Sequence, residues 1–334
     1  MREYQVAVLG ATGAVGREMI KILEERKCPV SDLVPLSSER SAGTRLSFCG
    51  DEVTVREISD GAFSGCDIVL GAAPNDTAKK YAPKIAAAGA VFIDNSSAYR
   101  MDENVPLVIP KINPEDASRH RGIISNPNCS TIIALVAVNA INRLSPIRSM
   151  TVSTYQAVSG AGARGISELF SQICDMQKGN APKCETFPYV IAYNLIPKIG
   201  DALENGYTSE EMKMQNEGRK ILHSPSLSVS CTCVRVPVVR SHSEAITVIT
   251  KEKIPAETAR AAISACDGCR LLDDAENDVY PTPILSEGGD LVLVGRVRED
   301  VALKNALALW CCGDQLRRGA ATNAVEIAEL ITRG

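Results

Sequence analysis

Membrane spans, basic runs and a complete set of zinc ligands are all missing from this chain. No apolar stretch among its 334 residues is long enough to cross a bilayer, and no cluster of Lys and Arg suits a nucleic-acid backbone. Only three histidines are present, and the pairs Cys231/Cys233 and Cys266/Cys269 are not matched by a second pair at zinc-finger spacing. We therefore expect no membrane, nucleic-acid or metal partner.

The remaining composition is that of an ordinary globular protein. Hydrophobic residues make up 45% and charged residues 23%, and the formal net charge is −4. A strand expected from residue 5 leaves no room for a signal peptide, and the twelve cysteines are expected to be reduced thiols. A cytoplasmic location is therefore expected, and the length favours two domains.

Strands and helices alternate in the first third of the chain. Strands are expected over residues 5–9, 67–72 and 90–94, with helices over 15–26 and 76–88 between them. This βαβ order predicts an α/β fold with a Rossmann-like, doubly wound parallel sheet.

The middle of the chain has a different pattern. A strand is expected over 150–158, helices over 163–176 and 208–222, and strands over 227–239 and 245–251 without a helix between them. The last two strands predict an α+β domain with a mixed sheet. Residues 305–331 are expected to be helical, with an interruption near Gly319. The predicted domains are residues 1–128 plus 315–334, and residues 129–314.

The first strand ends in a glycine motif, GATGAVG, which starts at Gly10. Glycines let the backbone approach a pyrophosphate, and the N-terminus of the following helix attracts its charge. Because the motif follows a strand and opens a helix, it predicts a dinucleotide site. The expected cofactor contacts are Gly10, Thr12, Gly13, Ala14 and Val15.

A second polar segment, SSERSAG from Ser37, favours NADP over NAD. Sites for NAD usually carry an acidic residue near the end of the second strand, where it binds the ribose hydroxyl. Here hydroxyl groups surround an arginine, which suits a 2′-phosphate, although Glu39 could accept the ribose hydroxyl instead. The expected ligands of the 2′-phosphate are Ser38, Arg40 and Ser41.

Cys129 stands at a strand-to-helix junction in the segment SNPNCST. A thiol at the start of a helix meets unpaired backbone N–H groups and the positive end of the helix dipole. This placement favours the thiolate, which is the nucleophilic form. The alternative is that Cys129 is one of twelve cysteines and merely packs. Beside a nicotinamide cofactor, a nucleophilic thiol suggests oxidation or reduction through a thioester.

Eight segments in one order resemble the aspartate-β-semialdehyde dehydrogenase family along nearly the whole chain. They are GATGAVG, SSERSAG, DNSSAYRMD, SNPNCST, TYQAVSGAG, EEMKMQNE, CVRVPVVRSHSE and GDQLRRGAATNAVEIAE. The resemblance implies NADPH-dependent reduction of L-aspartyl-4-phosphate to L-aspartate-4-semialdehyde, a step in lysine, threonine and methionine biosynthesis. It also implies an NADP-binding first domain, a second domain for catalysis and dimerisation, and a homodimer or homotetramer.

The resemblance also implies the catalytic residues. Cys129 would be the thioester nucleophile, His242 the general acid and base, and Gln156 the residue that orients the substrate. Of the other two histidines, His120 lies in a polar loop and His223 at a helix end, whereas His242 lies near a strand end, where sites form.

Substrate and cofactor contacts follow from the same resemblance. Arg235, between apolar strand residues, suits the substrate α-carboxylate. Glu210 would meet the substrate ammonium, although spacing alone does not choose between it and Glu211. The implied phosphate ligands are Lys213, Arg100 and Asn128, and the implied nicotinamide contacts are Ser159, Gly160 and Gln315.

Three other functions remain open at the level of sequence. An N-acetyl-γ-glutamyl-phosphate reductase would use the same chemistry, but its usual motif is HPGC rather than the NPNC that ends at Cys129, and its acetylated substrate has no use for Glu210. A non-catalytic dinucleotide-binding homologue would be expected to have lost the nucleophile or the base. A thiol redox sensor would need a resolving cysteine near Cys129, which the sequence cannot place.

Overall fold

The computed structural model describes residues 3–332, which divide into two compact units. The first unit contains the residues up to Asn128 and those from Gly319 onward, and the second runs from Cys129 to Arg318. The chain therefore returns to the first unit after Arg318, a few residues later than the expected boundary at 315.

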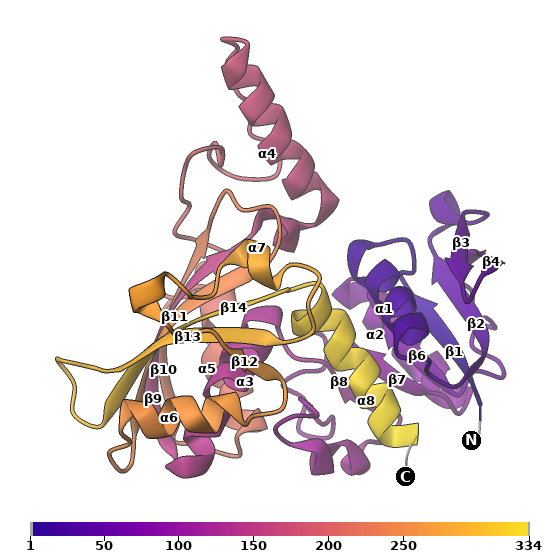
Figure 1. Ribbon diagram of the computed structural model, residues 1–334. Helices are drawn as coiled ribbons and strands as arrows, with labels where there is room; N and C mark the ends of the chain where they lie inside the picture. Colours follow the sequence, from indigo (N-terminus) through magenta and orange to yellow (C-terminus); the bar gives the residue numbers. More distant parts are fainter. Residues whose placement is uncertain (1–2, 333–334) are drawn as a thin grey trace. The chain divides into compact units, whose positions relative to one another are not determined.

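A parallel sheet forms the centre of the first unit, as predicted. Its strand order is β5-β2-β1-β6-β7-β8, and every pairing is parallel. Helices α1 and α8 pack on one face and α2 on the other (Figure 1). The elements are β1 (Tyr4–Leu9), α1 (Ala14–Glu25), β2 (Val30–Ser37), β5 (Arg56–Glu57), β6 (Ile68–Gly71), α2 (Asn75–Ala87), β7 (Val91–Asp94), β8 (Ile123–Ser125) and α8 (Thr322–Thr332), with a separate hairpin of β3 (Arg45–Phe48) and β4 (Asp51–Thr54).

The sequence of β1 explains this layering. Side chains alternate between the two faces of a strand, and β1 is apolar on both. Val6 and Val8 belong to the core that contains α1 and α8, whereas Ala7 and Leu9 belong to the core that contains α2. The strand is therefore buried between two helical layers.

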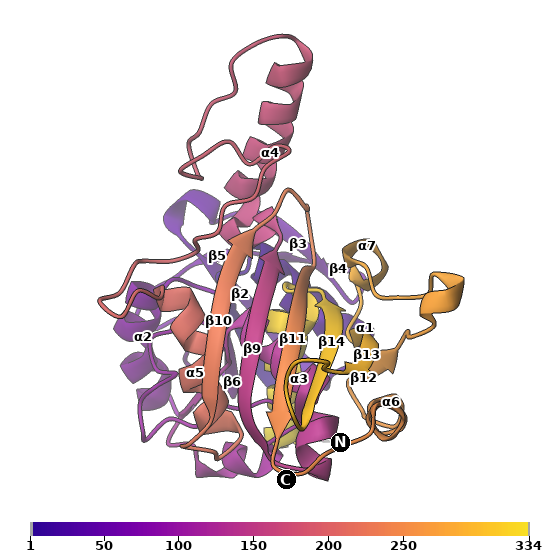
Figure 2. The same ribbon diagram turned by 90° about the vertical axis from the view of Figure 1, so that its left-hand side faces the viewer.

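The second unit is built on a mixed sheet of order β10-β9-β11-β14-β13-β12. Helices α3 and α5 pack on one of its faces, and α6 lies beside α3. The opposite face of β10, β9, β11 and β14 turns toward the viewer in Figure 2. The elements are α3 (Cys129–Leu144), β9 (Ile147–Gln156), α4 (Gly162–Gln177), α5 (Ser209–Ile221), β10 (Ser228–Arg235), β11 (His242–Thr250), α6 (Ala256–Ser264), β12 (Cys269–Leu271), α7 (Pro283–Ser286), β13 (Val292–Glu299) and β14 (Ala306–Gly313).

The prediction of a helix over residues 305–331 was wrong in its first part. Residues Ala306–Gly313 form β14, which pairs with β11 on one side and with β13 on the other. The segment ALALWCC is rich in helix formers and apolar throughout, so its local pattern does not distinguish a buried helix from a buried strand. Two neighbouring strands satisfy its backbone and decide the outcome.

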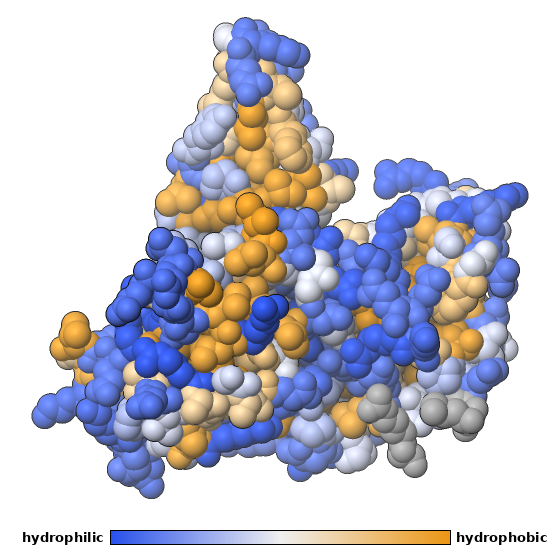
Figure 3. Space-filling view, in the orientation of Figure 1, coloured by the Kyte–Doolittle hydropathy of each residue, from blue (hydrophilic) through white to orange (hydrophobic). Residues whose placement is uncertain are grey.

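Helix α4 extends away from the sheet of the second unit (Figure 1). The space-filling view shows apolar side chains on this projecting arm (Figure 3). Phe170 and Met176 on α4, and Tyr189 and Tyr193 in the segment that follows it, are exposed. A solvent-exposed helix with such side chains is typical of an interaction surface.

Candidate active site

Strand register places four residues in one row at the end of the second sheet. Arg235 on β10 pairs with Gln156 on β9, and His242 on β11 pairs with Gly313 on β14. Because Ser243 pairs with Tyr155, the next position brings His242 beside Gln156. The side chains of Arg235, Gln156 and His242 are all buried. Three residues that lie far apart in the sequence are therefore neighbours. We call Arg235, Gln156 and His242 the catalytic row.

His242 is fully buried and is held as a neutral imidazole. Its Nδ1 accepts a hydrogen bond of 3.1 Å from the backbone N–H of Ala157. Its Nε2 has no hydrogen-bond partner among the described residues. Burial, and then the positive charge of Arg235, lowers the pKa of His242 to about 3.

The hydrogen bond to Nδ1 decides what this imidazole can do. A neutral ring whose Nδ1 accepts a hydrogen bond carries its proton on Nε2. His242 is therefore arranged to donate from Nε2, to a thiolate or to a developing oxyanion. It can take a proton at Nε2 only after the ring has given this one up.

Arg235 is anchored beside this imidazole. Its Nη1 donates to the carbonyl oxygen of Ala157 at 2.7 Å, and its guanidinium lies 5.9 Å from the centre of the Phe187 ring. Burial lowers the pKa of Arg235, and the negative charges of Cys129 and Glu210 partly offset this effect. The cation is thus close enough to the Cys129 sulfur to stabilise a thiolate.

The structure separates the roles of the two adjacent glutamates. Glu211 forms a capping box with Thr208 and accepts the backbone N–H of Cys233 at 3.0 Å, so its carboxylate stabilises the start of α5. Glu210 instead accepts hydrogen bonds from Gln156 (3.4 Å) and Lys213 (2.7 Å). Glu210 is therefore the carboxylate that faces the catalytic row.

Cys129 is the first residue of α3 and is half-buried. The sequence therefore located it correctly at a helix start, where backbone N–H groups lack intrahelical partners. None of the twelve cysteines, all of which lie in the described part of the chain, forms a disulfide.

Gly160, Ser159 and Gln315 also lie next to the row. A Cβ atom added to Gly160 would lie 2.7 Å from Nη1 of Arg235 and 3.6 Å from Nε2 of His242. Glycine is therefore needed for close packing at this position. Gln315 donates to the hydroxyl of Ser159 and accepts the backbone N–H of Ser241 at 2.8 Å.

The glycine loop of the first unit has the geometry of a dinucleotide cradle. Gly10 has φ +87°, and a Cβ there would lie 2.4 Å from the carbonyl oxygen of Ala72. A Cβ on Gly16 would lie 2.3 Å from the carbonyl oxygen of Gly10. Helix α1 begins at Ala14, and no side chain caps its N-terminus. The loop Gly10, Thr12, Gly13, Ala14 and Val15 therefore fits a bound pyrophosphate.

The residues expected to bind a 2′-phosphate follow the neighbouring strand. Strand β2 pairs with β1 and ends at Ser37, whose hydroxyl lies 2.9 Å from that of Thr12. Ser38, Arg40 and Ser41 come directly after it, in and beside a short 3₁₀ turn. Arg40 and Glu39 are both exposed.

Arg100 and Asn128 lie in the first unit, and both are buried. The guanidinium of Arg100 donates to the backbone carbonyls of Asn126 (2.9 Å) and Asn95 (2.8 Å). Arg100 is therefore not a solvated loop side chain. Asn126 also bonds to Asn323 (2.6 Å), which ties the segment before Cys129 to α8. Sequence reasoning missed Asn126, although it stands within the same motif.

Sequence reasoning also missed Glu244, two residues after His242 on β11. It pairs with Thr154 on β9 and Cys311 on β14, two positions along the strands from the catalytic row and on the same face of the sheet. Its side chain is fully buried, and neither carboxylate oxygen has a hydrogen-bond partner among the described residues. Burial, and then the nearby Cys233, raises the pKa of Glu244 well above its usual range.

This raised pKa predicts a pH-dependent stability. Above about pH 4.3 the unfolded chain releases a proton that folded Glu244 retains. The free energy of unfolding therefore falls as pH rises toward the folded pKa, by about 1.4 kcal/mol per pH unit for this group. We expect Glu244→Gln to be little changed at pH 5 and increasingly more stable than the wild type at higher pH. Urea unfolding at pH 5 and pH 8 measures this, with the exposed Glu257→Gln as control. An equal difference at both pH values would contradict the prediction.

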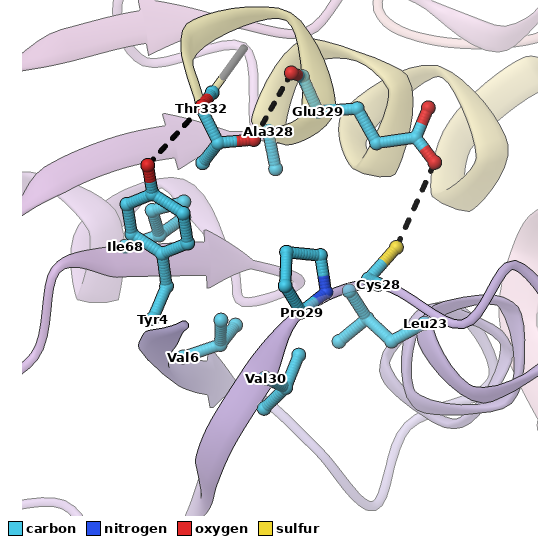
Figure 4. A pocket seen from close by; sticks show the side chains of 10 residues that line it. All are labelled: Tyr4, Val6, Leu23, Cys28, Pro29, Val30, Ile68, Ala328, Glu329 and Thr332. Atoms are coloured by element: carbon cyan, nitrogen blue, oxygen red, sulfur yellow. Dashed lines mark hydrogen bonds between the residues drawn. The ribbon is translucent and has the colours of Figure 1, made fainter. Parts of the chain in front are cut away.

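A small apolar cavity in the first unit does not belong to this chemistry. It has a volume of about 20 Å³ and lies between β1, α1 and α8 (Figure 4). Cys28 lies 3.7 Å from a carboxylate oxygen of Glu329, and the hydroxyl of Tyr4 donates to the carbonyl of Thr332 at 3.1 Å. A cavity of this size has room for about one water molecule and is too small for a substrate.

A glycine cradle on a parallel sheet, an imidazole and an arginine on a second sheet, and a thiol at the start of α3 define a dinucleotide-binding protein with a nucleophilic site. The model "Semialdehyde dehydrogenase, NAD binding domain" matches residues 5–120, and "Semialdehyde dehydrogenase, dimerisation domain" matches residues 139–318. The chain belongs to the semialdehyde dehydrogenase family, and the resemblance in its motifs is confirmed.

Relatives narrow the family further. The chain is 47% identical to the aspartate-semialdehyde dehydrogenase of Synechocystis sp., over 98% of this chain and 97% of that one. It is 48% identical to that of Aquifex aeolicus, over 99% and 98%. The crystal structure of aspartate semialdehyde dehydrogenase II from Vibrio cholerae complexed with ASA superposes with a TM-score of 0.97 at 44% identity, over 100% of this chain and 99% of that one. No helix among residues 3–332 is long and apolar enough to span a membrane.

Proposed function

We propose that this protein is an NADP-dependent aspartate-semialdehyde dehydrogenase that reduces L-aspartyl-4-phosphate to L-aspartate-4-semialdehyde and releases phosphate. The observation that carries the proposal is the row of Arg235, Gln156 and His242, together with the charge interaction between Arg235 and Cys129. The high identity to curated aspartate-semialdehyde dehydrogenases supports the same conclusion.

Cys129 is the nucleophile in this scheme. Its thiolate attacks the acyl carbon of the substrate, the C–O bond to phosphate breaks, and an enzyme thioester forms. Arg235 stabilises the thiolate, and Nε2–H of His242 donates to the oxygen on which negative charge develops. The nicotinamide, when bound, supplies the hydride that reduces the thioester to an aldehyde. The thiolate of Cys129 is then the leaving group.

Charge complementarity assigns the substrate contacts. The Arg235 guanidinium suits the α-carboxylate, and the Glu210 carboxylate suits the ammonium. Gln156, which already bonds to Glu210, orients the substrate between them. Lys213, Arg100 and Asn128 are the proposed ligands of the phosphate. The free ammonium of aspartyl phosphate gives Glu210 a partner that an N-acetylated substrate lacks, which favours this function over its nearest rival.

The cofactor residues are proposed on the same basis. The loop of Gly10, Thr12, Gly13, Ala14 and Val15 binds the pyrophosphate. Ser38, Arg40 and Ser41 bind the 2′-phosphate and give the preference for NADP. Ser159, Gly160 and Gln315 border the nicotinamide. Residues 1–128 with the C-terminal helix are thus the cofactor domain, and the remainder carries catalysis and dimerisation.

The open face of the second sheet supports a homodimer. Tyr155, Thr247 and Trp310 lie on this face and are only partly buried in the single chain, and the matching family model is a dimerisation domain. A second copy of the chain would cover both this face and the exposed apolar side chains of α4. We place the protein in the cytoplasm because twelve thiols persist best in a reducing compartment. Sedimentation of the full chain measures the oligomeric state.

One assay tests the proposed function. Steady-state rates are measured in the reverse direction with aspartate semialdehyde, phosphate, and either NADP or NAD. We expect turnover that requires phosphate and prefers NADP. Turnover with N-acetyl-glutamate semialdehyde but not with aspartate semialdehyde would establish the rival reductase instead.

Loss of the Arg235 guanidinium is expected to weaken substrate binding selectively. Two charge-assisted hydrogen bonds contribute about 3–4 kcal/mol, so Arg235→Ala should raise KM for aspartate semialdehyde by about 10²–10³-fold. Arg235→Lys keeps the charge but not the planar fork and should be intermediate. The dissociation constant of NADP, measured by fluorescence, is the control. An equal loss of cofactor affinity would contradict the anchoring role.

A further inference from the structure

The ladder between β11 and β14 ends at the pair His242 and Gly313. Beyond this pair, side chains replace the backbone hydrogen bonds between the two segments. Asp314 accepts from Nε of Arg240 at 2.7 Å, and Gln315 accepts from the backbone N–H of Ser241 at 2.8 Å. Asp314 also accepts the backbone N–H of Gly288 at 2.7 Å. Two consecutive side chains thus hold the two residues that precede His242.

Ser241 has a backbone conformation that requires such support. Its φ is +75°, in a region that side chains other than glycine rarely adopt. A conformation of this kind costs about 1–3 kcal/mol and persists only where surrounding contacts hold it. Its own hydroxyl is fully buried and has no hydrogen-bond partner among the described residues. The backbone N–H bond to Gln315 is therefore one of the contacts that hold the turn.

Both ends of the Gln315 amide are engaged inside the protein. The oxygen accepts from Ser241, and the nitrogen donates to the hydroxyl of Ser159. The Gln315 side chain is almost completely buried. Gln315 therefore links the segment of Ser159 and Gly160 to the residue immediately before His242.

We infer that Gln315 is a positioning residue for His242: by holding Ser241 at positive φ, it directs Nε2 of the imidazole toward the reacting thioester. The inference rests on the proposed function, and it adds to the nicotinamide contact proposed for Gln315 a role that does not involve the cofactor. The direction of a side chain follows from the backbone that carries it, so relaxation of Ser241 turns the His242 ring away from Arg235 and Gly160.

The first experiment compares Gln315→Leu with Gln315→Glu. Leucine removes both hydrogen bonds, whereas glutamate keeps an acceptor for Ser241 N–H and can accept from the Ser159 hydroxyl. We expect Gln315→Leu to lower kcat, measured at saturating NADP, about 10–100-fold, and Gln315→Glu to lower it several-fold less. Ser159→Ala, which removes one bond, should lie between them. Equal losses in both Gln315 variants, or a change confined to NADP affinity, would overturn the inference.

A second background tests the route through Ser241. Glycine adopts positive φ without strain, so Ser241→Gly needs less support from Gln315. We expect Gln315→Leu to lower kcat several-fold less in the Ser241→Gly background than in the wild type. An identical loss in both backgrounds would show that Gln315 does not act through Ser241.

A third readout does not depend on activity. The chain has only three histidines, so ¹⁵N-histidine NMR resolves the tautomer of each imidazole. We expect the His242 ring to be a neutral Nε2–H tautomer in the wild type and in Gln315→Glu, and to lose this signature in Gln315→Leu. An unchanged His242 signal in a folded Gln315→Leu chain would overturn the positioning role. This result is distinct from a failure of the proposed function, which would appear as absent turnover in the wild type.

Discussion

Replacement of Cys129 by alanine is expected to abolish phosphate-dependent NADP reduction by aspartate semialdehyde while NADP still binds. A thioester cannot form without the sulfur, and removal of an enzyme nucleophile lowers kcat by about 10⁴–10⁶-fold. The glycine cradle belongs to the other compact unit, so the substitution leaves its residues unchanged. Steady-state assays and NADP titration by fluorescence measure the two properties separately.

The chain provides a matched control for this substitution. Cys174 lies on α4 and is exposed, so Cys174→Ala makes the same chemical change away from the catalytic row. It should retain full activity. Iodoacetamide should inactivate both the wild type and Cys174→Ala, with bound substrate protecting both. Full activity in Cys129→Ala would refute the thioester mechanism.

Loss of the His242 imidazole is expected to have the second largest effect. General acid catalysis by a positioned side chain contributes about 10²–10⁴-fold, and His242→Asn should lower kcat by that amount. An asparagine oxygen can still accept the Ala157 N–H, which keeps the local structure. His242→Gln instead places an amide donor near the position of Nε2, so it retains a hydrogen bond but no transferable proton.

The two variants distinguish proton transfer from hydrogen bonding. If proton donation by His242 is essential, both variants lose activity to a similar extent. Near-wild-type activity in His242→Gln would show that a hydrogen bond to the oxyanion suffices, and would contradict a role in proton transfer. Thermal unfolding midpoints, measured in parallel, check that both variants fold.

The pH profile provides a related check on His242. Burial and Arg235 lower its pKa to about 3, so the imidazole stays neutral across the ordinary assay range. Its protonation is expected only near pH 3, well below the usual histidine pKa of about 6.5. If an ionisation near pH 6.5 in the wild-type kcat profile came from His242, it would be missing from the profile of His242→Asn. We expect no such ionisation. Its presence would indicate a more solvated imidazole than the structure describes.

Local pattern was sufficient for the features that depend on neighbouring residues in the chain. The βαβ alternation, the glycine loop before α1 and the helix start at Cys129 were all predictable, because strand and helix periodicity and the conformational freedom of glycine act over a few residues. The apolar run that became β14 was not predictable in this way. Its helical composition was overridden by pairing with β11 and β13.

The catalytic row shows the same division between local and long-range information. The sequence by itself determined the fold class and the glycine loop, and it supplied the residues that we propose as catalytic. Only the tertiary structure decided that Glu210 rather than Glu211 faces the row and that Nδ1 of His242 accepts a hydrogen bond. It also decided that the buried carboxylate of Glu244 has no hydrogen-bond partner among residues 3–332. These outcomes depend on strand register and burial. Both arise from contacts between residues that are distant along the chain, and no local sequence pattern records them.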